Sequence, residues 1–147
     1  MLSSPYTTTE FDVSGNEHNG TIVGTILKEQ NNGSVGRFDG AYKFTGSEYI
    51  RAHQSAKVKD AITVSIWGYM DNWSQYSSVN SGMRLASCTE SGGWNFEPNG
   101  GMRFSVGTSS NTYKWVKDST ALSSLSSGWH MFTGTYDGKN VKIYVDG

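Results

Sequence analysis

Hydrophobic and polar residues alternate along several segments of the chain, most clearly over residues 62–70. Aliphatic side chains occupy positions 62, 64 and 66, and Thr63 and Ser65 lie between them. Successive side chains of a β-strand point to opposite faces of its sheet, so a period of two residues is typical of a strand with one buried face. Residues 62–70 are therefore predicted to form a strand.

Residues 129–136 and 141–145 alternate in the same way and are joined by the sequence DGKN. An Asp-Gly pair between alternating segments predicts a β-hairpin, because glycine tolerates the left-handed backbone of such turns. The sequence TGS between residues 41–44 and 48–51 predicts a second hairpin. Further short strands are predicted at residues 21–26, 83–87, 94–96, 102–106 and 112–116. Helical patterns are nearly absent, and only residues 55–60 and 120–126 are each expected to hold a single turn.

The composition agrees with many short strands joined by turns. The chain has 147 residues, among them 18 glycines, 5 tryptophans, 8 tyrosines and 6 phenylalanines. Aromatic residues favour strands, and glycine favours the turns between them. The length suits one hydrophobic core, and the chain has neither an internal repeat nor an evident domain boundary. We predict a single all-β domain over residues 1–147, with an antiparallel β-sandwich of the jelly-roll type.

Charge and hydrophobicity exclude several functional classes. The formal net charge is −1, which offers no basic surface for nucleic acid. No apolar run approaches the roughly 18 residues that a membrane-spanning helix needs, and residues 1–9 lack the basic and apolar segments of a signal peptide. The lone cysteine, Cys88, excludes an internal disulfide. We therefore expect neither a nucleic-acid partner nor a membrane span.

Four segments, in order and spacing, together resemble the laminin-G-like family of concanavalin-A-like lectin/glucanase jelly rolls. They are DVSGN at residues 12–16, GAYKF at 40–44, ITVSIWGYM at 62–70 and GWHMFTGTYDGKNVKIYVDG at 128–147. Each segment is weak alone, but four in order over most of the chain are specific. Domains of this family normally continue for several strands past the YVDG turn. We therefore expect the chain to lack its last strands and to be part of a longer protein.

The resemblance implies a recognition function. The family includes lectins, carbohydrate-binding modules, adhesion domains and some glycosidases, so the fold alone does not decide the function. We expect a non-catalytic module that binds a glycan or polysaccharide, within a larger extracellular, cell-surface or virion protein. The alternative is a structural or assembly domain, for example in a phage tail, that binds no sugar. Other protein chains would then complete the open edge of its sheet.

Catalysis is not predicted from the acidic residues or the histidines. A glycosidase needs two carboxylates about 5–10 Å apart across the scissile bond, which acids at alternate positions of one strand would provide. Among the glutamates, only Glu10 has an acidic residue two positions away, Asp12, and this pair precedes a loop. The three histidines, His18, His53 and His130, lie in unrelated contexts. We therefore expect no enzymatic activity.

Four aromatic residues are candidates for sugar binding, because aromatic rings stack on pyranose rings while polar neighbours bind the hydroxyl groups. They lie in polar or glycine-rich surroundings and are Trp73, Tyr76, Trp94 and Trp115. The alternative for each is a loop anchor or a core residue. Trp67 and Trp129, inside the clearest strands, are predicted to be core residues.

Calcium is the cofactor that the resemblance implies, with Asp12 and Asn16 of the loop at residues 12–16 as its side-chain ligands. Calcium binds six to eight oxygen atoms of carboxylates, amides and backbone carbonyls, and Gly15 permits the tight turn. The alternative is an Asx turn, in which the Asp12 carboxylate accepts hydrogen bonds from nearby backbone N–H groups.

Overall fold

The computed structural model describes residues 9–30, 40–52, 60–76, 84–88, 92–109, 112–120 and 122–147. The chain divides into two compact units, Met1–Ser55 and Ala56–Gly147. One domain over residues 1–147 stays a prediction. Antiparallel strands dominate the described residues, which confirms the all-β class. Among these residues no helix is both long and apolar enough to cross a membrane.

The described part of the first unit forms two sets of paired strands. One is a sheet in the order β1-β2-β5, and the other is the pair β3-β4, all antiparallel. Their bounds are β1 (Thr9–Glu10), β2 (Gly20–Val23), β3 (Leu27–Gln30), β4 (Gly40–Lys43) and β5 (Tyr49–Arg51). The Glu10 carboxylate links the two sets, because it accepts a hydrogen bond from the Tyr42 hydroxyl and lies 3.5 Å from Lys28 Nζ.

The predicted hairpin of residues 41–44 with 48–51 is wrong. β4 pairs with β3 and β5 pairs with β2, so the two segments belong to different sheets. The Glu48 carboxylate holds the turn between them, accepting hydrogen bonds from the N–H groups of Thr45 and Gly46 at 3.0 and 2.7 Å. A side chain closes this turn in place of a strand ladder, and each strand finds its partner elsewhere in the unit.

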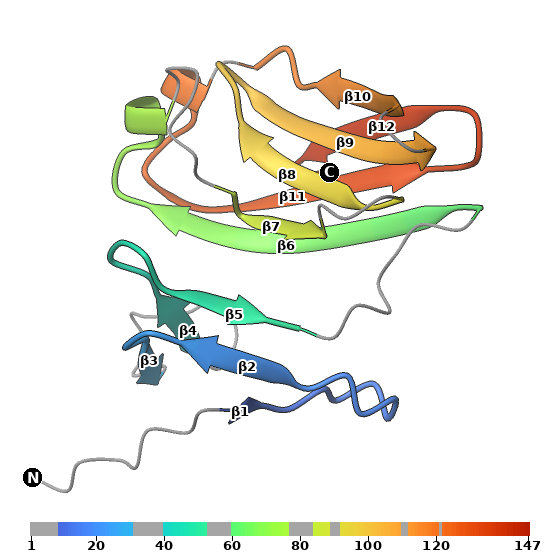
Figure 1. Ribbon diagram of the computed structural model, residues 1–147. Helices are drawn as coiled ribbons and strands as arrows, with labels where there is room; N and C mark the ends of the chain where they lie inside the picture. Colours follow the sequence, from blue (N-terminus) through green and yellow to red (C-terminus); the bar gives the residue numbers. More distant parts are fainter. Residues whose placement is uncertain are drawn as a thin grey trace, which may run out of the picture. The chain divides into compact units, whose positions relative to one another are not determined.

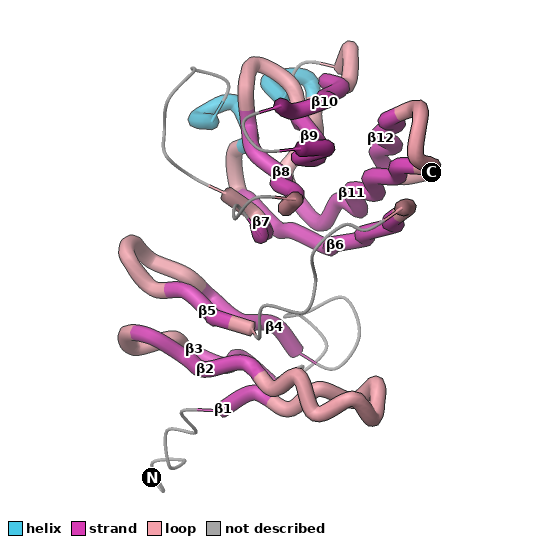
Figure 2. The backbone as a smooth tube through the Cα atoms, turned by 45° about the vertical axis from the view of Figure 1, so that its right-hand side comes forward, coloured by secondary structure: helices cyan, strands magenta, loops and turns pink. Residues whose placement is uncertain are grey.

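The second unit is a sandwich of two antiparallel sheets, seen as two layers in Figure 1 and Figure 2. One sheet has the order β12-β11-β6 and the other β10-β9-β8-β7. The first contains β6 (Ile62–Met70), β11 (Gly128–Tyr136) and β12 (Val141–Val145). The second contains β7 (Ala86–Cys88), β8 (Trp94–Pro98), β9 (Met102–Ser109) and β10 (Thr112–Lys117). The arrangement confirms the predicted β-sandwich.

The core of the second unit lies between these sheets. Two short 3₁₀ helices, η2 (Trp73–Tyr76) and η3 (Leu122–Ser124), contribute to it beside the strands. Phe104 of β9 packs on Phe96, with ring centroids 4.7 Å apart, and fills the space over Gly134 of β11. The buried core residues are Trp73, Phe96, Met102, Phe104, Val106, Leu122, Phe132 and Tyr136. Removal of this aromatic surface from water is the main force that holds the two sheets together.

Alternation predicted the long strands well, since β6 and β12 have the predicted bounds, 62–70 and 141–145. The predicted DGKN hairpin is also confirmed, because β11 and β12 pair on either side of it. Hydrogen bonds from the N–H groups of Asn140 and Lys139 lower the pKa of Asp137 in this turn to about 2.

The two predicted helical turns have different outcomes. The turn predicted within residues 120–126 is η3. Of the other, residues 55–60, only Asp60 belongs to the described part of the chain.

Candidate functional site

Two exposed aromatic side chains stand on one face of β10. Trp115 is 61% exposed and Tyr113 is 52% exposed. Residues two apart on a strand share a face and lie about 7 Å apart, so the two side chains project from the same face. On β9, the guanidinium carbon of Arg103 lies 5.9 Å from the centroid of the Trp115 ring, close enough for a cation–π attraction. The result is an exposed aromatic surface that is partly held in place by a cation.

Small polar residues cover the centre of the same face, which we call the outer face of the β10-β9-β8-β7 sheet because it points away from the core. Ser105 of β9 lies opposite both Trp115 of β10 and Asn95 of β8 in the strand register. Asn95 and Ser105 are both buried. The exposed rings on the edge strand could stack on a flat, hydroxyl-rich ligand, and these small polar groups lie buried beside them.

A carboxylate on the outer face binds two arginines. Glu97 of β8 pairs with Arg103 Nη2 through Oε1, and Arg84 Nε lies 3.9 Å from Glu97 Oε2. Asn95 Nδ2 donates a hydrogen bond of 2.7 Å to Glu97 Oε2. Asn95 therefore positions Glu97, Glu97 positions Arg103, and Arg103 lies against the Trp115 ring.

Two buried polar atoms of this network have no hydrogen-bond partner among the described residues. They are the acceptor Asn95 Oδ1 and the donor Arg103 Nε. An unpaired buried polar atom costs about 1–3 kcal/mol, and folded proteins contain few of them. A polar ligand or a water molecule that supplied the missing partners would recover part of this cost, which marks the outer face as a candidate binding surface.

Asn95, Glu97 and Arg103 are absent from the predicted site residues, because they are neither aromatic rings nor a pair of acids at alternate positions. A usable signal was present in the period-two pattern of β8. Phe96 points into the core, so Asn95 and Glu97 on either side of it must point to the outer face.

Trp73 was predicted to bind sugar, and the structure corrects this prediction. Its ring is only 1% exposed and packs edge-on against Phe132, with centroids 5.2 Å apart. Its Nε1 donates a hydrogen bond of 3.3 Å to the carbonyl oxygen of Gly128. A buried ring has no free face for stacking, so Trp73 is a core residue of the second unit.

Trp94 and Trp115 were each predicted as candidates for sugar binding, and the structure places them on opposite faces of their sheet. Trp94 lies opposite Val106 in the register and packs against the core cluster. Trp94 is half-buried, and its role in sugar binding stays a prediction. The side chain of Tyr76, at the end of η2, lies outside the described part of the structure, so its role stays a prediction.

Trp67 and Trp129 were predicted to be core residues, and this is wrong. Both are half-buried, and neither belongs to the core cluster or packs against it. They lie on the face of their sheet that points away from the sandwich core, where the Trp129 ring packs edge-on against Tyr69 at 5.6 Å.

The loop at residues 12–16 adopts the Asx turn that was the alternative to a calcium site. Asp12 Oδ1 accepts a hydrogen bond of 2.8 Å from the N–H of Ser14. Its Oδ2 accepts hydrogen bonds from Ser14 Oγ at 2.7 Å and from the N–H of His18 at 3.0 Å. These hydrogen bonds, led by that of the Ser14 side chain, lower the pKa of Asp12. Asn16 turns its Nδ2 toward Ser14 Oγ, 2.9 Å away.

This arrangement fits a capped turn better than a calcium site. A cation would compete with three hydrogen-bond donors for the Asp12 oxygens, and calcium needs six to eight oxygen ligands. Within the described ranges, no three or more His, Cys, Asp or Glu side chains are placed to hold a metal ion. Calcium binding by Asp12 and Asn16 stays a prediction.

An open hollow of about 340 Å³ adjoins this turn in the first unit. Its lining includes Glu10, Asp12, Ser14 and the exposed Phe11. The Glu10 carboxylate already accepts a hydrogen bond from the Tyr42 hydroxyl, and the Asp12 carboxylate accepts one from the Ser14 hydroxyl. The hollow therefore offers a ligand fewer available polar groups than the outer face does.

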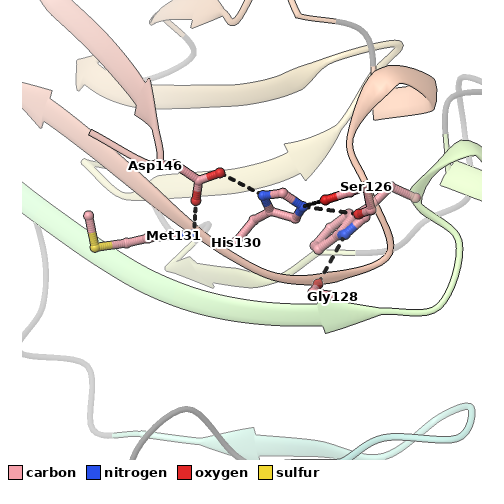
Figure 3. A network of polar contacts seen from close by, with 6 residues as sticks. Ser126, Gly128, His130, Met131 and Asp146 are labelled. Atoms are coloured by element: carbon pink, nitrogen blue, oxygen red, sulfur yellow. Dashed lines mark hydrogen bonds and ion pairs between the residues drawn. The ribbon is translucent and has the colours of Figure 1, made fainter.

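A buried histidine joins three segments of the second unit (Figure 3). His130 Nδ1 lies 2.6 Å from Asp146 Oδ2, and Nε2 lies 3.0 Å from the carbonyl oxygen of Ser126. Asp146 Oδ1 accepts a hydrogen bond of 2.9 Å from the N–H of Met131. The Asp146 carboxylate therefore ties the end of β12 to β11, and His130 ties both to the loop before β11.

The order Ser126, His130, Asp146 has the composition of a catalytic triad, but its geometry does not support one. Nε2 lies nearer to the carbonyl oxygen of Ser126, at 3.0 Å, than to Ser126 Oγ, at 3.5 Å. In a triad the hydroxyl oxygen is the close partner of this nitrogen. The network as arranged joins structural elements.

Acid is expected to weaken this network. Burial opposes ionisation of Asp146, but the hydrogen bonds from His130 and from the N–H of Met131 outweigh it and lower its pKa below 3.8. A carboxyl group with a lowered pKa stabilises the fold above its ordinary pKa, and this stabilisation is lost as the pH falls through the folded value. Denaturant unfolding from pH 6 to pH 2 should show a smaller acid-dependent loss in Asp146→Asn than in the wild type. An unchanged pH slope would contradict the role of the Asp146 carboxylate.

Comparison with known families agrees with this geometry. The family model described as the Concanavalin A-like lectin/glucanases superfamily, a laminin-G-type model, matches residues 44–147. No curated protein and no solved structure matches the chain. The match covers more than half of the chain and includes the whole described sandwich of the second unit. The chain therefore belongs to the concanavalin A-like lectin/glucanase superfamily.

Proposed function

We propose that this protein is a non-catalytic glycan-binding module, and that the glycan stacks on Trp115 and Tyr113 at the outer face of the β10-β9-β8-β7 sheet. The superfamily commonly binds carbohydrate or mediates protein contacts. The observation that carries the proposal is the exposed pair of rings beside a buried polar network that has an unused donor and an unused acceptor.

Each part of the outer face matches one need of sugar recognition. The apolar face of a pyranose ring stacks on an aromatic ring, and its hydroxyl groups need both donors and acceptors at the rim. Trp115 is oriented by Arg103, which reduces the conformational entropy that the ring loses on binding. An extracellular, cell-surface or virion location is part of the proposal, since surface glycans are found there.

The alternative, an assembly domain that binds other protein chains, has its own supporting observation. On the opposite sheet, Tyr69 and Tyr144 are 50% and 41% exposed and share their outward face with the half-buried Trp129. Half-exposed aromatic residues on a flat sheet are typical of protein-binding surfaces. The outer face of the β10-β9-β8-β7 sheet combines exposed rings with two buried polar atoms, Asn95 Oδ1 and Arg103 Nε, that lack a hydrogen-bond partner among the described residues. We therefore favour the glycan.

A glycan-array screen of the folded domain tests the proposed function. We expect binding to at least one glycan class, and equal binding in EDTA and in added calcium, because the Asp12 carboxylate is occupied by hydrogen bonds. Binding that disappeared in EDTA would instead support the calcium site of Asp12 and Asn16. A blank array with a domain that is folded by circular dichroism, together with self-association in solution, would favour the assembly domain.

A further inference from the structure

Among the residues that the structure describes, the outer face of the β10-β9-β8-β7 sheet carries an excess of positive charge, although the whole chain has a net charge of −1. The register places Lys117 of β10 directly opposite Arg103 of β9, and Arg103 opposite Glu97 of β8. Arg84 also approaches Glu97, at 3.9 Å. This row therefore has three cations for one carboxylate.

Lys117 is the cation whose charge is not compensated. Its side chain is exposed and has no ion-pair partner in the parts of the chain that the structure describes. The next residue, Asp118, uses its Oδ1 to accept a hydrogen bond of 2.7 Å from the N–H of Thr120. Like charges directly opposite each other on a sheet face repel. An anion bound between Lys117 and Arg103 would relieve this repulsion.

We propose that the glycan bound at Trp115 is acidic, with an anionic substituent between Lys117 and Arg103 while its ring stacks on Trp115. Trp115 and Lys117 are two residues apart on the same face, about 7 Å along the strand. A pyranose ring with an anionic substituent can bridge this span. This inference rests on the proposed function, because Trp115 serves in both.

The buried polar atoms support a ligand at this position. Asn95, which is 9% exposed, lies on the same face with its Oδ1 unpartnered. Arg103 Nε is also unpartnered, while Arg103 Nη2 is held by Glu97. The anion would therefore meet an arginine that is already oriented by Glu97.

Two matched pairs of probes test the class of ligand. Polygalacturonate and its fully methyl-esterified form differ in the methyl ester that removes each carboxylate charge, and dextran sulfate and dextran differ in sulfate. Alginate adds a second uronate. We expect binding to at least one acidic polymer to be about tenfold or more tighter than to its neutral partner, and to weaken as salt is raised. The pair that shows the difference identifies the anion as carboxylate or sulfate.

Lys117→Gln should reduce the preference for the acidic probe by about tenfold, the effect of losing one charge-assisted hydrogen bond. Lys142→Gln is the matched control, since Lys142 is an exposed lysine on β12 of the other sheet, and it should bind like the wild type. Equal binding of charged and neutral probes, lost in Trp115→Ala but unchanged in Lys117→Gln, would overturn the acidic class and leave the glycan site in place. The absence of binding to every probe, acidic or neutral, would overturn both.

Discussion

Replacing Trp73 with alanine is expected to lower the free energy of unfolding by about 3–5 kcal/mol, the usual cost of truncating a buried tryptophan. The ring is 1% exposed and lies against Phe132 and His130. Its loss would open a cavity between η2 and β11 and would leave the carbonyl oxygen of Gly128 without its donor. Denaturant unfolding followed by circular dichroism measures the change.

Trp115→Ala is the matched control for that experiment. The Trp115 ring is 61% exposed, and surface substitutions of this kind usually change stability by about 0.5 kcal/mol or less. If the two variants were destabilised equally, the division into one core tryptophan and one surface tryptophan would be contradicted.

The second large effect is expected at Gly134, in the middle of β11. A Cβ atom at this position would overlap the ring of Phe104, so Gly134→Ala must displace a ring that is fully buried. Overpacking of this kind costs about 1–3 kcal/mol, and more where the neighbour cannot move. Gly68→Ala on β6 is the comparison, because its added Cβ would meet side-chain atoms only at 3.3 Å, and it should cost less.

A double-mutant cycle locates the cause of the Gly134 effect. Phe104→Ala removes the Cγ, Cδ1 and Cδ2 atoms that the new methyl group would strike, so Gly134→Ala should cost less in the Phe104→Ala background than in the wild type. The coupling free energy should be about 1 kcal/mol or larger, as for residues in direct contact. Strict additivity of the two substitutions would show that the Gly134 effect has another origin.

Local patterns predicted the parts of the fold whose pairing is itself local. The period of nine alternating residues is enough to predict β6, and the geometry of the Asp-Gly turn is enough to predict the pairing of β11 with β12. The hairpin predicted around Thr45 failed for the opposite reason. The predicted turn is present, but β4 pairs with β3 and β5 pairs with β2. Which strands pair over longer range depends on packing within the whole unit and not on the local sequence.

The candidate site was only partly predictable for the same reason. Trp73 and Trp115 both lie in polar surroundings in the sequence, and only the three-dimensional packing buries one ring and exposes the other. The partners of Trp115 come from other strands, since Arg103 lies on β9 and Glu97 on β8. Periodicity could assign each of these residues to a face, but their contacts depend on the register between strands.

The most direct test of the account is the effect of Trp115 on glycan binding. The glycan found in the array should be titrated by calorimetry against the wild type, Trp115→Ala and Tyr144→Ala, the last being an exposed aromatic residue of the other sheet. The account predicts that Trp115→Ala loses affinity by about tenfold or more, in line with the stacking of one ring, while it stays folded and Tyr144→Ala binds normally. Full binding by Trp115→Ala, or a loss confined to Tyr144→Ala, would contradict the assignment of the outer face of the β10-β9-β8-β7 sheet as the binding surface.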